Sequence, residues 1–305
     1  MKYTGKPLQY SLKEHLNISN FISSVYRTTK QLDDFPLARF EIWVYEHYNE
    51  NTDFFADNCH IWRDDSGEIA GILISEDGEN GFHLISHPHN TGIFEIMISF
   101  LFDSRAKDKN ELWTELSAFK RKEHEIYAEY GIVKTESYAL TRYYDLKNFS
   151  LIAEIPEDYY IESADMNLNP AKHVELVKNA FGKDFYSEKL YKKLRNSPNY
   201  HADLDITVYS KTGKAVSACT GWVDPVNRTA EIETVCTHSD YRRKGLARIA
   251  MIKCLQKLKE KGVSKAYISS LNDVTHNFYD SFSYKNRQKS YEYSWKRKSD
   301  NYRHN

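Results

Sequence analysis

An internal repeat is the feature that most restricts the folds open to this chain. The segments IWRDDSGEIAGILI (61–74) and ITVYSKTGKAVSACT (206–220) both follow the pattern of a strand, a glycine turn and a second strand. The segments EIYAEYGI (125–132) and NFYDSFSY (277–284) share the spacing of their aromatic residues. The sequence therefore predicts two copies of one fold along the chain.

The length and composition of the chain agree with two domains. Its 305 residues suffice for two ordinary domains, and a hydrophobic content of 41% suffices for two packed cores. We place the boundary near residue 153, where a final strand and a connector precede Pro156 and a new strand. The expected parts are a first copy at 1–152, a second copy at 153–298 and a polar tail at 299–305.

The charge balance and the cysteines argue against several classes of partner. Lys and Arg (42) nearly equal Asp and Glu (43), so no overall field attracts nucleic acid or an anionic membrane. Neither a long apolar run nor a signal peptide is present, which favours a cytoplasmic location. The four scattered cysteines predict reduced thiols, with neither a metal site nor a disulfide. A monomer and a homodimer both stay open.

Short strands and helices alternate in the second copy, which is typical of an α/β or α+β fold. A helix at 246–261 carries a broad apolar stripe that ends at Gly262. The other predicted helices lie near 169–181, 186–196 and 274–282. The predicted strands lie near 159–165, 203–210, 214–224, 229–237, 265–271 and 289–297.

A cationic loop, Arg242-Arg243-Lys244-Gly245, stands directly before the helix at 246–261. A helix N-terminus exposes unpaired N–H groups and a partial positive charge, and a glycine there lets the backbone approach an anion. The loop therefore predicts a phosphate or pyrophosphate site, with a solvated turn as the alternative. The chain has no GxxxxGK[ST] segment, and Gly245 alone cannot make GxGxxG, so kinase, NTPase and dinucleotide sites are not favoured.

The loop resembles the coenzyme A loop of the GNAT superfamily of N-acetyltransferases, whose Arg/Gln-x-x-Gly-x-Gly/Ala signature matches Arg242 to Ala247. Before the loop, AEIETVCT (230–237) resembles the central strand of that family, whose end pairs with the pantetheine arm. After the helix, KAYISSL (265–271) resembles the strand that splays away from its neighbour to admit the cofactor. NDVTHNFYDSFSY (272–284) resembles the Asn-x-x-x-x-x-x-Tyr-x-x-x-Gly-Phe segment.

The match is not complete, because Ser283 and Tyr284 replace the usual Gly and Phe of that last segment. The resemblance covers most of 157–298. It implies two tandem GNAT-like domains, each with a mixed, mainly antiparallel central sheet flanked by helices, and acetyl-CoA as co-substrate. The cofactor-binding residues that it implies are Val235, Cys236, Thr237, Arg242, Arg243, Lys244, Gly245, Leu246, Ala247, Arg248, Asn272 and Asn277.

Two glutamates are candidates for the base of an acetyl transfer to an amine. Strict alternation along the strand places Glu231, Glu233, Val235 and Thr237 on one face and Ile232, Thr234 and Cys236 on the other. Of two neighbouring carboxylates, one holds its proton more tightly and can accept a proton from the amine, directly or through water. Glu231 matches the strand glutamate that some family members use as base, and Glu233 is a close rival. The alternative for both glutamates is that they lie on a solvated face of the strand or interact with structural partners.

Tyr279 resembles the general acid of the family, and an ordinary pKa near 10 suits donation to a thiolate leaving group. A core tyrosine is the alternative for Tyr279, as a helix cap is for Asn272. We assign His238 to the turn or the phosphate side rather than to the base, and Cys236 to packing rather than to an acyl-enzyme. Three aromatic residues are candidates for the walls of the substrate pocket: Phe181, Phe185 and Trp222. A position in the core is the alternative for each.

These features predict an N-acetyltransferase (EC 2.3.1 type) that moves the acetyl group of acetyl-CoA to a primary amine of a small molecule by direct attack in a ternary complex. Within the same family, a longer acyl donor, or a protein N-terminus or lysine as acceptor, stays open. From a different class, a catalytically silent acyl-CoA-binding sensor or interaction module is the rival.

The first copy lacks the cationic loop. The segment ISHPHNTGIFEIMISFLF (85–102) aligns with 235–255, and of the loop signature only Gly92 remains. Tyr127 occupies the place of Tyr279, where packing explains it. We therefore predict one acetyl-CoA per chain, and for residues 1–152 a structural role that includes walling the acceptor site.

Overall fold

The computed structural model describes residues 2–47, 53–166 and 169–297, so the predicted polar tail at 299–305 lies outside the described residues. The first half of the chain forms β1 (Thr4–Pro7), α1 (Leu12–Thr29), α2 (Leu37–His47), α3 (Asp53–Asn58), β2 (Cys59–Arg63), β3 (Ile69–Ile74), β4 (His83–Ser86), α4 (Ile93–Ser104), a short 3-10 helix (Arg105–Asp108), β5 (Glu111–Ser117), α5 (Arg121–Glu129) and β6 (Val133–Asp145).

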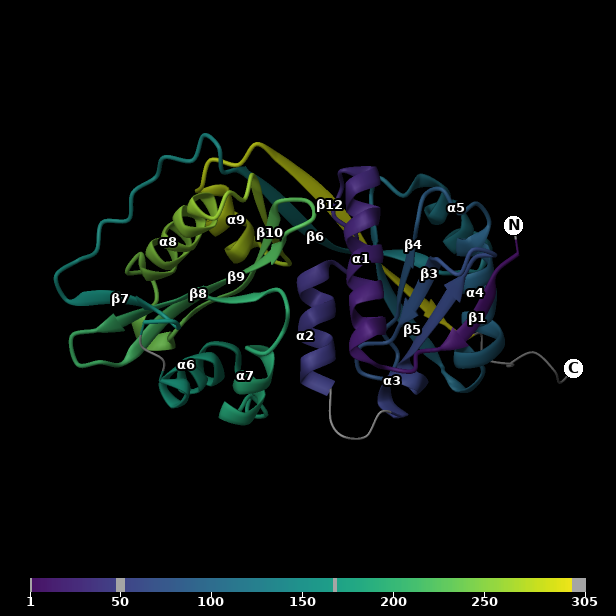
Figure 1. Cartoon of the computed structure of the whole chain (residues 1–305), viewed down its shortest axis with the longest axis horizontal. Coiled ribbons are helices and arrows are strands. Elements are labelled where there is room, and N and C mark those ends of the chain that lie inside the picture. Colours follow the sequence, from purple (N-terminus) through teal and green to yellow (C-terminus); the bar gives the residue numbers. More distant parts are fainter. Residues whose placement is uncertain (1, 48–52, 167–168, 298–305) are drawn as a thin grey trace, which may run out of the picture.

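The second half repeats the order of the strands and α-helices, as the repeat in the sequence predicts, with α3 as an addition of the first half and the 3-10 segments at different places (Figure 1). It forms β7 (Tyr159–Ser163), α6 (Pro170–Phe181), α7 (Glu188–Leu194), β8 (Tyr200–Ser210), β9 (Ala215–Asp224), β10 (Thr229–Thr237), a 3-10 turn (Ser239–Tyr241), α8 (Leu246–Glu260), β11 (Lys265–Ser270), α9 (Asp273–Asp280) and β12 (Asn286–Lys296). The predicted tandem α/β fold with mainly antiparallel sheets is thereby confirmed.

Local signals explain where the helices begin and end. The side chains of Asn169 and Ser187 accept hydrogen bonds from the first turns of α6 and α7, and Pro170 occupies the first turn of α6. Gly182 ends α6 in the left-handed conformation. Such caps involve residues only a few positions apart, which is why the sequence places these helices to within a few residues.

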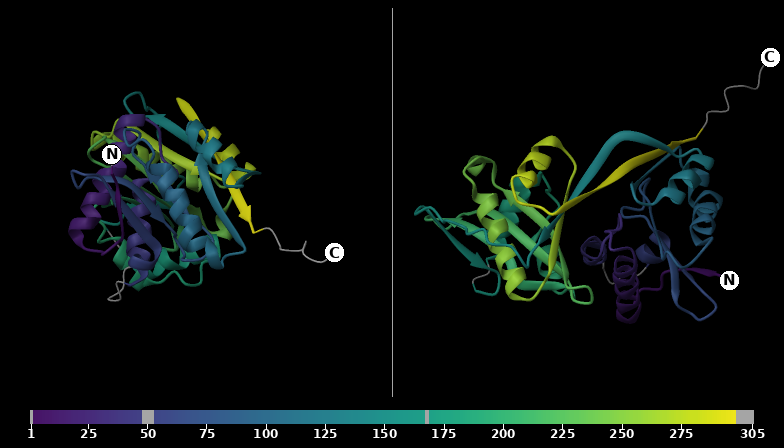
Figure 2. Two further views of the ribbon diagram at one scale, coloured as in Figure 1. Left: turned by 90° about the vertical axis from the view of Figure 1, so that its right-hand side faces the viewer. Right: turned by 90° about the horizontal axis from the view of Figure 1, so that it is seen from above.

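The last strands of the two halves are exchanged. One sheet contains β1-β2-β3-β4, and a second, longer sheet has the order β5-β12-β6-β11-β10-β9-β8-β7. Thus β12 lies between β5 and β6 of the first half, while β6 lies between β12 and β11 of the second half. Figure 2 shows β6 and β12 running together from one body of the molecule to the other. The strands β6 and β12 thus pair with strands of the other half, across the predicted domain boundary near residue 153. That boundary stays a prediction.

Two parallel strands part in the second half. β10 pairs with β11 only where Thr229–Glu231 faces Lys265–Tyr267, and beyond Glu231 the two strands diverge. The corresponding strands β4 and β5 of the first half belong to different sheets, joined by a single bridge between Gly81 and Trp113. The splayed strand that the resemblance implies is therefore present, and beyond Glu231 one edge of β10 has no strand partner among the described residues.

Helices cover both faces of the sheet in the second half. The apolar stripe of α8 packs on one face, where Ile232, Leu255 and Tyr279 belong to one buried cluster. Helices α6 and α7 pack on the other face, where Val177 and Cys236 belong to a second cluster (Figure 1). The end of β10 consequently lies between two helical layers.

Helix α2 of the first half joins the second half through a buried carboxylate. Glu41 of α2 accepts hydrogen bonds from the Asn199 amide at 2.7 Å and from the Ser197 hydroxyl. His15 of α1 contacts the same carboxylate at 3.0 Å. Because the Glu41 side chain is fully buried, these partners fix the position of α2 against the second half. No helix in the described ranges is long and apolar enough to cross a membrane.

Candidate active site between the two halves

The cationic loop has the backbone geometry of an anion site. Gly245 caps α8 in the left-handed conformation, with φ of 78°, and Arg243 also has a positive φ, 62°. A Cβ on Gly245 would meet no atom within 4 Å, so the backbone conformation alone favours glycine there. The backbone N–H groups from Arg243 to Arg248 have no acceptor among the described residues. They are open to an anion at the N-terminus of α8.

The side chains of the loop leave their charges available. Arg242 donates to the carbonyl of Ala180 at 3.2 Å, which ties the loop to the end of α6. The Lys244 ammonium lies 5.0 Å from the centre of the Tyr241 ring. Within the described ranges, neither these cations nor Arg243 has a carboxylate partner. The loop can therefore offset the charge of a pyrophosphate.

Arg248 and the other predicted cofactor residues lie around the same end of the sheet. Arg248 donates to the carbonyl and hydroxyl oxygens of Ser281 at 3.3 and 3.2 Å, which links α8 to the end of α9. Asn272 caps α9, since its side chain accepts from the Thr275 N–H at 3.0 Å, and Asn277 is exposed on α9. The capping alternative for Asn272 is thus realised in the structure.

His238 acts in the turn that precedes the loop. Its Nδ1 accepts from the Asp240 N–H at 3.3 Å, and its ring packs edge-on against Tyr241. The side chain is buried. This arrangement agrees with the expectation that His238 belongs to the turn rather than to the base.

A bulge in β10 corrects the predicted alternation of its side chains. The register between β10 and β9 shifts between Ile232 and Val235. As a result, Val235 packs against the cluster under α8, the same side as Ile232, and not on the face of Glu231. The prediction for Val235 was wrong because a bulge adds a residue and reverses the faces that follow it. Cys236 packs under α6 and α7, opposite to Ile232, so its predicted face was also wrong for the same reason, while its predicted packing role agrees with the structure.

Two cavities meet at Glu233. The larger, about 510 Å³, lies between the two halves and is lined by Glu231 and Glu233 together with residues of α2, β5 and β6. The smaller, about 120 Å³, lies under α6 and α7 and shares Glu46, Lys183 and Glu233 with the first. Both predicted glutamates therefore line one cavity despite the bulge.

The predicted aromatic walls divide between the cavity and the surface. Phe181 and Trp222 line the smaller cavity, and the Trp222 indole N–H donates to the carbonyl oxygen of Glu233 at the bulge. Phe185 is exposed and is not part of that lining; its ring lies 5.8 Å from the Lys183 ammonium. Trp222 thus helps to hold the bulge that carries Glu233.

Glu231 is buried beside the N-terminus of α2. Its side chain is 8% exposed, and its Oε2 has no hydrogen-bond partner among the described residues. Burial, followed by the negative charge of Glu233, raises the pKa of Glu231 to about 8, although Arg39 and the Ala38 N–H of α2 act against this shift. A carboxyl group with this pKa exchanges its proton near neutral pH, as a general base for an amine requires.

Glu233 faces the space where the cavities meet. Its side chain is exposed toward this space, yet the surrounding walls displace water and raise the pKa of its carboxyl group above the ordinary value. The positive charges of Lys183 and Arg39 limit this rise. Arg39 of the first half therefore limits the rise in the pKa of both glutamates of the second half.

Tyr279 lies in the core under α8, 7% exposed, and lines neither cavity, so the core position given as its alternative is realised and the acid role stays a prediction. Burial and then the charge of Glu233 raise its pKa above the ordinary value, so the hydroxyl keeps its proton. Strand β6 of the first half holds α9 in place: Arg142 donates to Asp280 at 2.7 Å and to the His276 carbonyl at 3.1 Å. The Tyr144 hydroxyl donates to the Tyr279 carbonyl at 3.2 Å. The exchanged strand therefore positions the candidate acid.

The larger cavity carries an excess of carboxylates that the sequence did not reveal. Arg39 pairs with Glu76 at 2.6 Å and with Glu115 at 3.0 Å, and Lys120 pairs with the two aspartates that precede α2. The lining carboxylates left without such a pair include Glu46, Glu231 and Glu233, with Lys183 as the nearby cation. No local pattern marks Arg39 or Glu46, because they meet the glutamates of β10 only when the halves come together.

The first half repeats the loop backbone without its cations. Gly92 caps α4 in the left-handed conformation with φ of 80°, close to the 78° of Gly245. The residues before it, His87 to Thr91, include neither lysine nor arginine. Tyr127 is fully buried in the core of the first half, as its predicted packing role requires.

The sequence matches a known family over the region that contains this site. Residues 173–284 match the model of the acetyltransferase (GNAT) family. No match to the chain is found among curated proteins. The matched region includes the loop, the two glutamates and Tyr279.

Solved structures extend the likeness to the whole chain. A tandem GNAT protein from the clavulanic acid biosynthesis pathway superposes with a TM-score of 0.69 at 13% identity, covering 97% of this chain and 98% of that one. A GCN5-related N-acetyltransferase from Sphaerobacter thermophilus gives 0.63 at 13% identity, covering 96% and 95%. A GNAT-family acetyltransferase from Colwellia psychrerythraea gives 0.59 at 11% identity, covering 96% and 100%. The chain has the fold of the tandem GNAT proteins, and within its second half residues 173–284 match the GNAT-family model.

Proposed function

We propose that this chain transfers the acetyl group of acetyl-CoA to a primary amine of a small molecule, in a ternary complex formed by its second half. The observation that carries the proposal is the unpartnered edge of β10 beside the cationic loop. The backbone N–H groups from Arg243 to Arg248 and the three cations before Gly245 fit the phosphates of coenzyme A. The divergence of β10 and β11 fits its pantetheine arm.

The two glutamates of the cavity and Tyr279 in the neighbouring core support a division of proton transfers. Acetyl-CoA supplies an activated thioester when it is bound. Glu231, with a pKa of about 8 and an oxygen free of hydrogen bonds, accepts the proton of the incoming ammonium, directly or through water. Glu233 is the second candidate for this role. The Tyr279 hydroxyl donates a proton to the departing thiolate, and backbone N–H groups near Val235 to Thr237 stabilise the developing oxyanion.

The cavity supports a small, positively charged acceptor. A volume of about 510 Å³ lies in the range of small-molecule sites. When ionised, Glu46, Glu231 and Glu233 attract an amine in its charged form and hold it close to the base that removes its proton. Residues 1–152 then wall the acceptor site, because Glu46 and Arg39 come from α2.

The experiment compares the parent with Tyr279→Phe. Purified protein is incubated with acetyl-CoA and a panel of small amines, peptides and longer acyl-CoA donors, and the released thiol is followed. We expect kcat to fall by about 10²–10⁴ in Tyr279→Phe with acetyl-CoA affinity unchanged, because only the proton donor is lost. The control is Tyr159→Phe, which removes a hydroxyl group from the border of the same core.

The outcomes separate the proposal from its rivals. Thiol release by the parent and the control but not by Tyr279→Phe supports the enzyme. Acetyl-CoA binding without thiol release from any donor and acceptor would show a silent binding module instead. Turnover only with peptides would replace the small-molecule acceptor by a protein N-terminus or lysine.

A further inference from the structure

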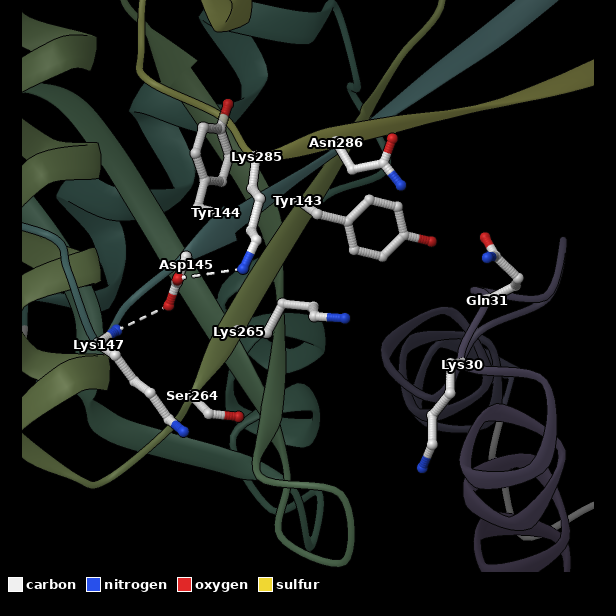
Figure 3. Close-up of a pocket in the computed structure, with 10 residues that line it drawn as sticks. All are labelled: Lys30, Gln31, Tyr143, Tyr144, Asp145, Lys147, Ser264, Lys265, Lys285 and Asn286. Carbon is white, nitrogen blue, oxygen red and sulfur yellow. Dashed lines mark hydrogen bonds and ion pairs between the residues drawn. The ribbon is translucent and has the colours of Figure 1, made fainter.

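A third cavity lies at the other end of the shared sheet, away from the cationic loop. It has a volume of about 520 Å³. The beginnings of β11 and β12 and the end of β6 form one wall, and the end of α1 forms the other (Figure 3). We call it the lysine pocket, after its lining residues Lys30, Lys147, Lys265 and Lys285.

The lysine pocket is separate from the candidate active site. Lys265 at the start of β11 pairs with Thr229 at the start of β10, whereas the cationic loop follows Thr237 at the end of β10. At about 3.3 Å per residue, the nine residues of β10 place the two sites on the order of 25 Å apart. A ligand of the lysine pocket therefore does not occupy the coenzyme A cleft.

The pocket holds more positive than negative charge. Asp145 is the carboxylate of its lining, and its oxygens are shared among the Lys285 ammonium at 3.6 Å, the Asn148 amide at 3.0 Å and the Lys147 N–H at 3.1 Å. Among the described residues, Lys30, Lys147 and Lys265 have no carboxylate within ion-pair distance. Lys265 and Lys30 thus come from opposite walls of the cavity, and Asp145 does not balance the charges of the four lysines in its lining.

Aromatic contacts hold Lys265 at the centre of the pocket. Its ammonium lies 5.3 Å from the Tyr143 ring centre and 6.0 Å from the Tyr26 ring centre. The Tyr143 hydroxyl is fixed in turn, since it donates to Gln288 at 2.6 Å and accepts from the Leu32 N–H at 3.0 Å. Figure 3 shows Lys265 and Tyr143 pointing from the sheet toward Lys30 and Gln31 on α1 and the loop after it.

The lysine charges repel one another, and a bound anion would offset this unfavourable electrostatic energy. Burial, and then the positive charges of Lys285 and Lys30, lower the pKa of Lys265. Asp145 acts in the opposite direction without restoring the ordinary value. A bound anion adds the missing counter-charge beside Lys265, whose ammonium the two tyrosine rings already hold, while Lys30, Lys147 and Lys285 are exposed.

We propose that the lysine pocket binds a small anion with two or more negative charges, such as a phosphate ester or a polycarboxylate. The volume lies in the range of small-molecule sites, and lysine ammonium groups bind phosphate and carboxylate as point charges. Because Lys30 belongs to the end of α1 and Lys265 to the shared sheet, the bound anion links the two walls. This proposal does not depend on the acetyltransferase activity.

The test is calorimetric titration of the full chain at constant ionic strength with pyrophosphate and, separately, with citrate. We expect each variant Lys30→Gln and Lys265→Gln to weaken binding by about tenfold, as for loss of one charged contact. Lys265→Arg, which keeps the charge, should bind nearly as the parent does. The matched control Lys13→Gln removes a charge from the exposed opposite end of α1 and should have no effect.

A further variant separates the pocket from the cationic loop, which also attracts phosphates. Arg242→Glu should leave citrate and pyrophosphate binding at the lysine pocket intact. The proposal is overturned if neither anion binds the parent, if Lys13→Gln weakens binding as much as Lys265→Gln does, or if Arg242→Glu alone abolishes it. Binding of pyrophosphate but not citrate assigns the pocket to phosphate esters, and the reverse assigns it to polycarboxylates.

Discussion

At the scale of single residues, the environment of Glu231 leads to a measurable pH dependence of stability. Folding raises the pKa of Glu231 from about 4.5 to about 8, so the folded state binds this proton more tightly than the unfolded state. The stabilisation is fully present below the lower pKa and is lost as pH rises through the higher one. Glu231→Gln stays neutral, so its unfolding free energy should fall less than that of the parent between pH 6 and pH 9, by roughly 1–3 kcal/mol.

Chemical unfolding at several pH values measures this difference. Glu125→Gln, an exposed glutamate on α5, serves as the control and should follow the parent. Parallel curves for the parent and Glu231→Gln would contradict the raised pKa. If Glu231 is also the base, kcat/KM of the parent should rise with pH through the same range. This rise should be absent from the pH profile of Glu231→Gln. If the rise of kcat/KM with pH persists in Glu231→Gln, the base is Glu233 or a chain of waters.

At the scale of elements, the junction of β10, the cationic loop and α8 determines cofactor binding. Arg242→Glu places a negative charge where the first turn of α8 presents its open N–H groups, so acetyl-CoA affinity should fall at least about 100-fold. Because Arg242 is exposed, the fold should persist. Acetyl-CoA should raise the melting temperature of the parent but not of the variant, since a ligand that prefers the folded state stabilises it.

Arg121→Glu is the matched control for this experiment, because Arg121 is an exposed arginine at the first residue of another helix, α5. It should bind acetyl-CoA as the parent does. If Arg242→Glu binds acetyl-CoA as tightly as the parent, the assignment of the loop is wrong.

The elements also show what the sequence can and cannot predict. The helices of the second half and the strand at 229–237 were predicted closely, because caps such as Gly245 and apolar stripes are signals within one segment. The bulge after Ile232 was missed, because a bulge is defined by the register with β9. The cavities were missed for a related reason. Arg39 lines a cavity with Glu231, and Lys30 lines one with Lys265, and each pair is separated by far more of the sequence than a local pattern covers.

At the scale of the whole molecule, the two halves have the same order of elements but only one has a charged loop. We therefore expect calorimetric titration of the intact chain with acetyl-CoA to give one site per chain. Gly92 repeats the backbone conformation of Gly245, yet the residues before it supply no cation to offset a pyrophosphate. Saturation at two sites, or one strong site remaining in Arg242→Glu, would contradict this expectation.

The exchange of β6 and β12 also sets the order in which this chain can mature on the ribosome. The first half is made with an open slot between β5 and β6, and the strand that fills it, Asn286–Lys296, is synthesised after all the other strands of this sheet. At about 5–20 residues per second, the slot stays open for on the order of ten seconds. In most multidomain chains the first domain folds while the second is being made. Here the eight-stranded sheet that both halves share cannot be completed before β12 is translated, although the four-stranded sheet β1-β2-β3-β4 does not need it, so the two halves reach their final structure together.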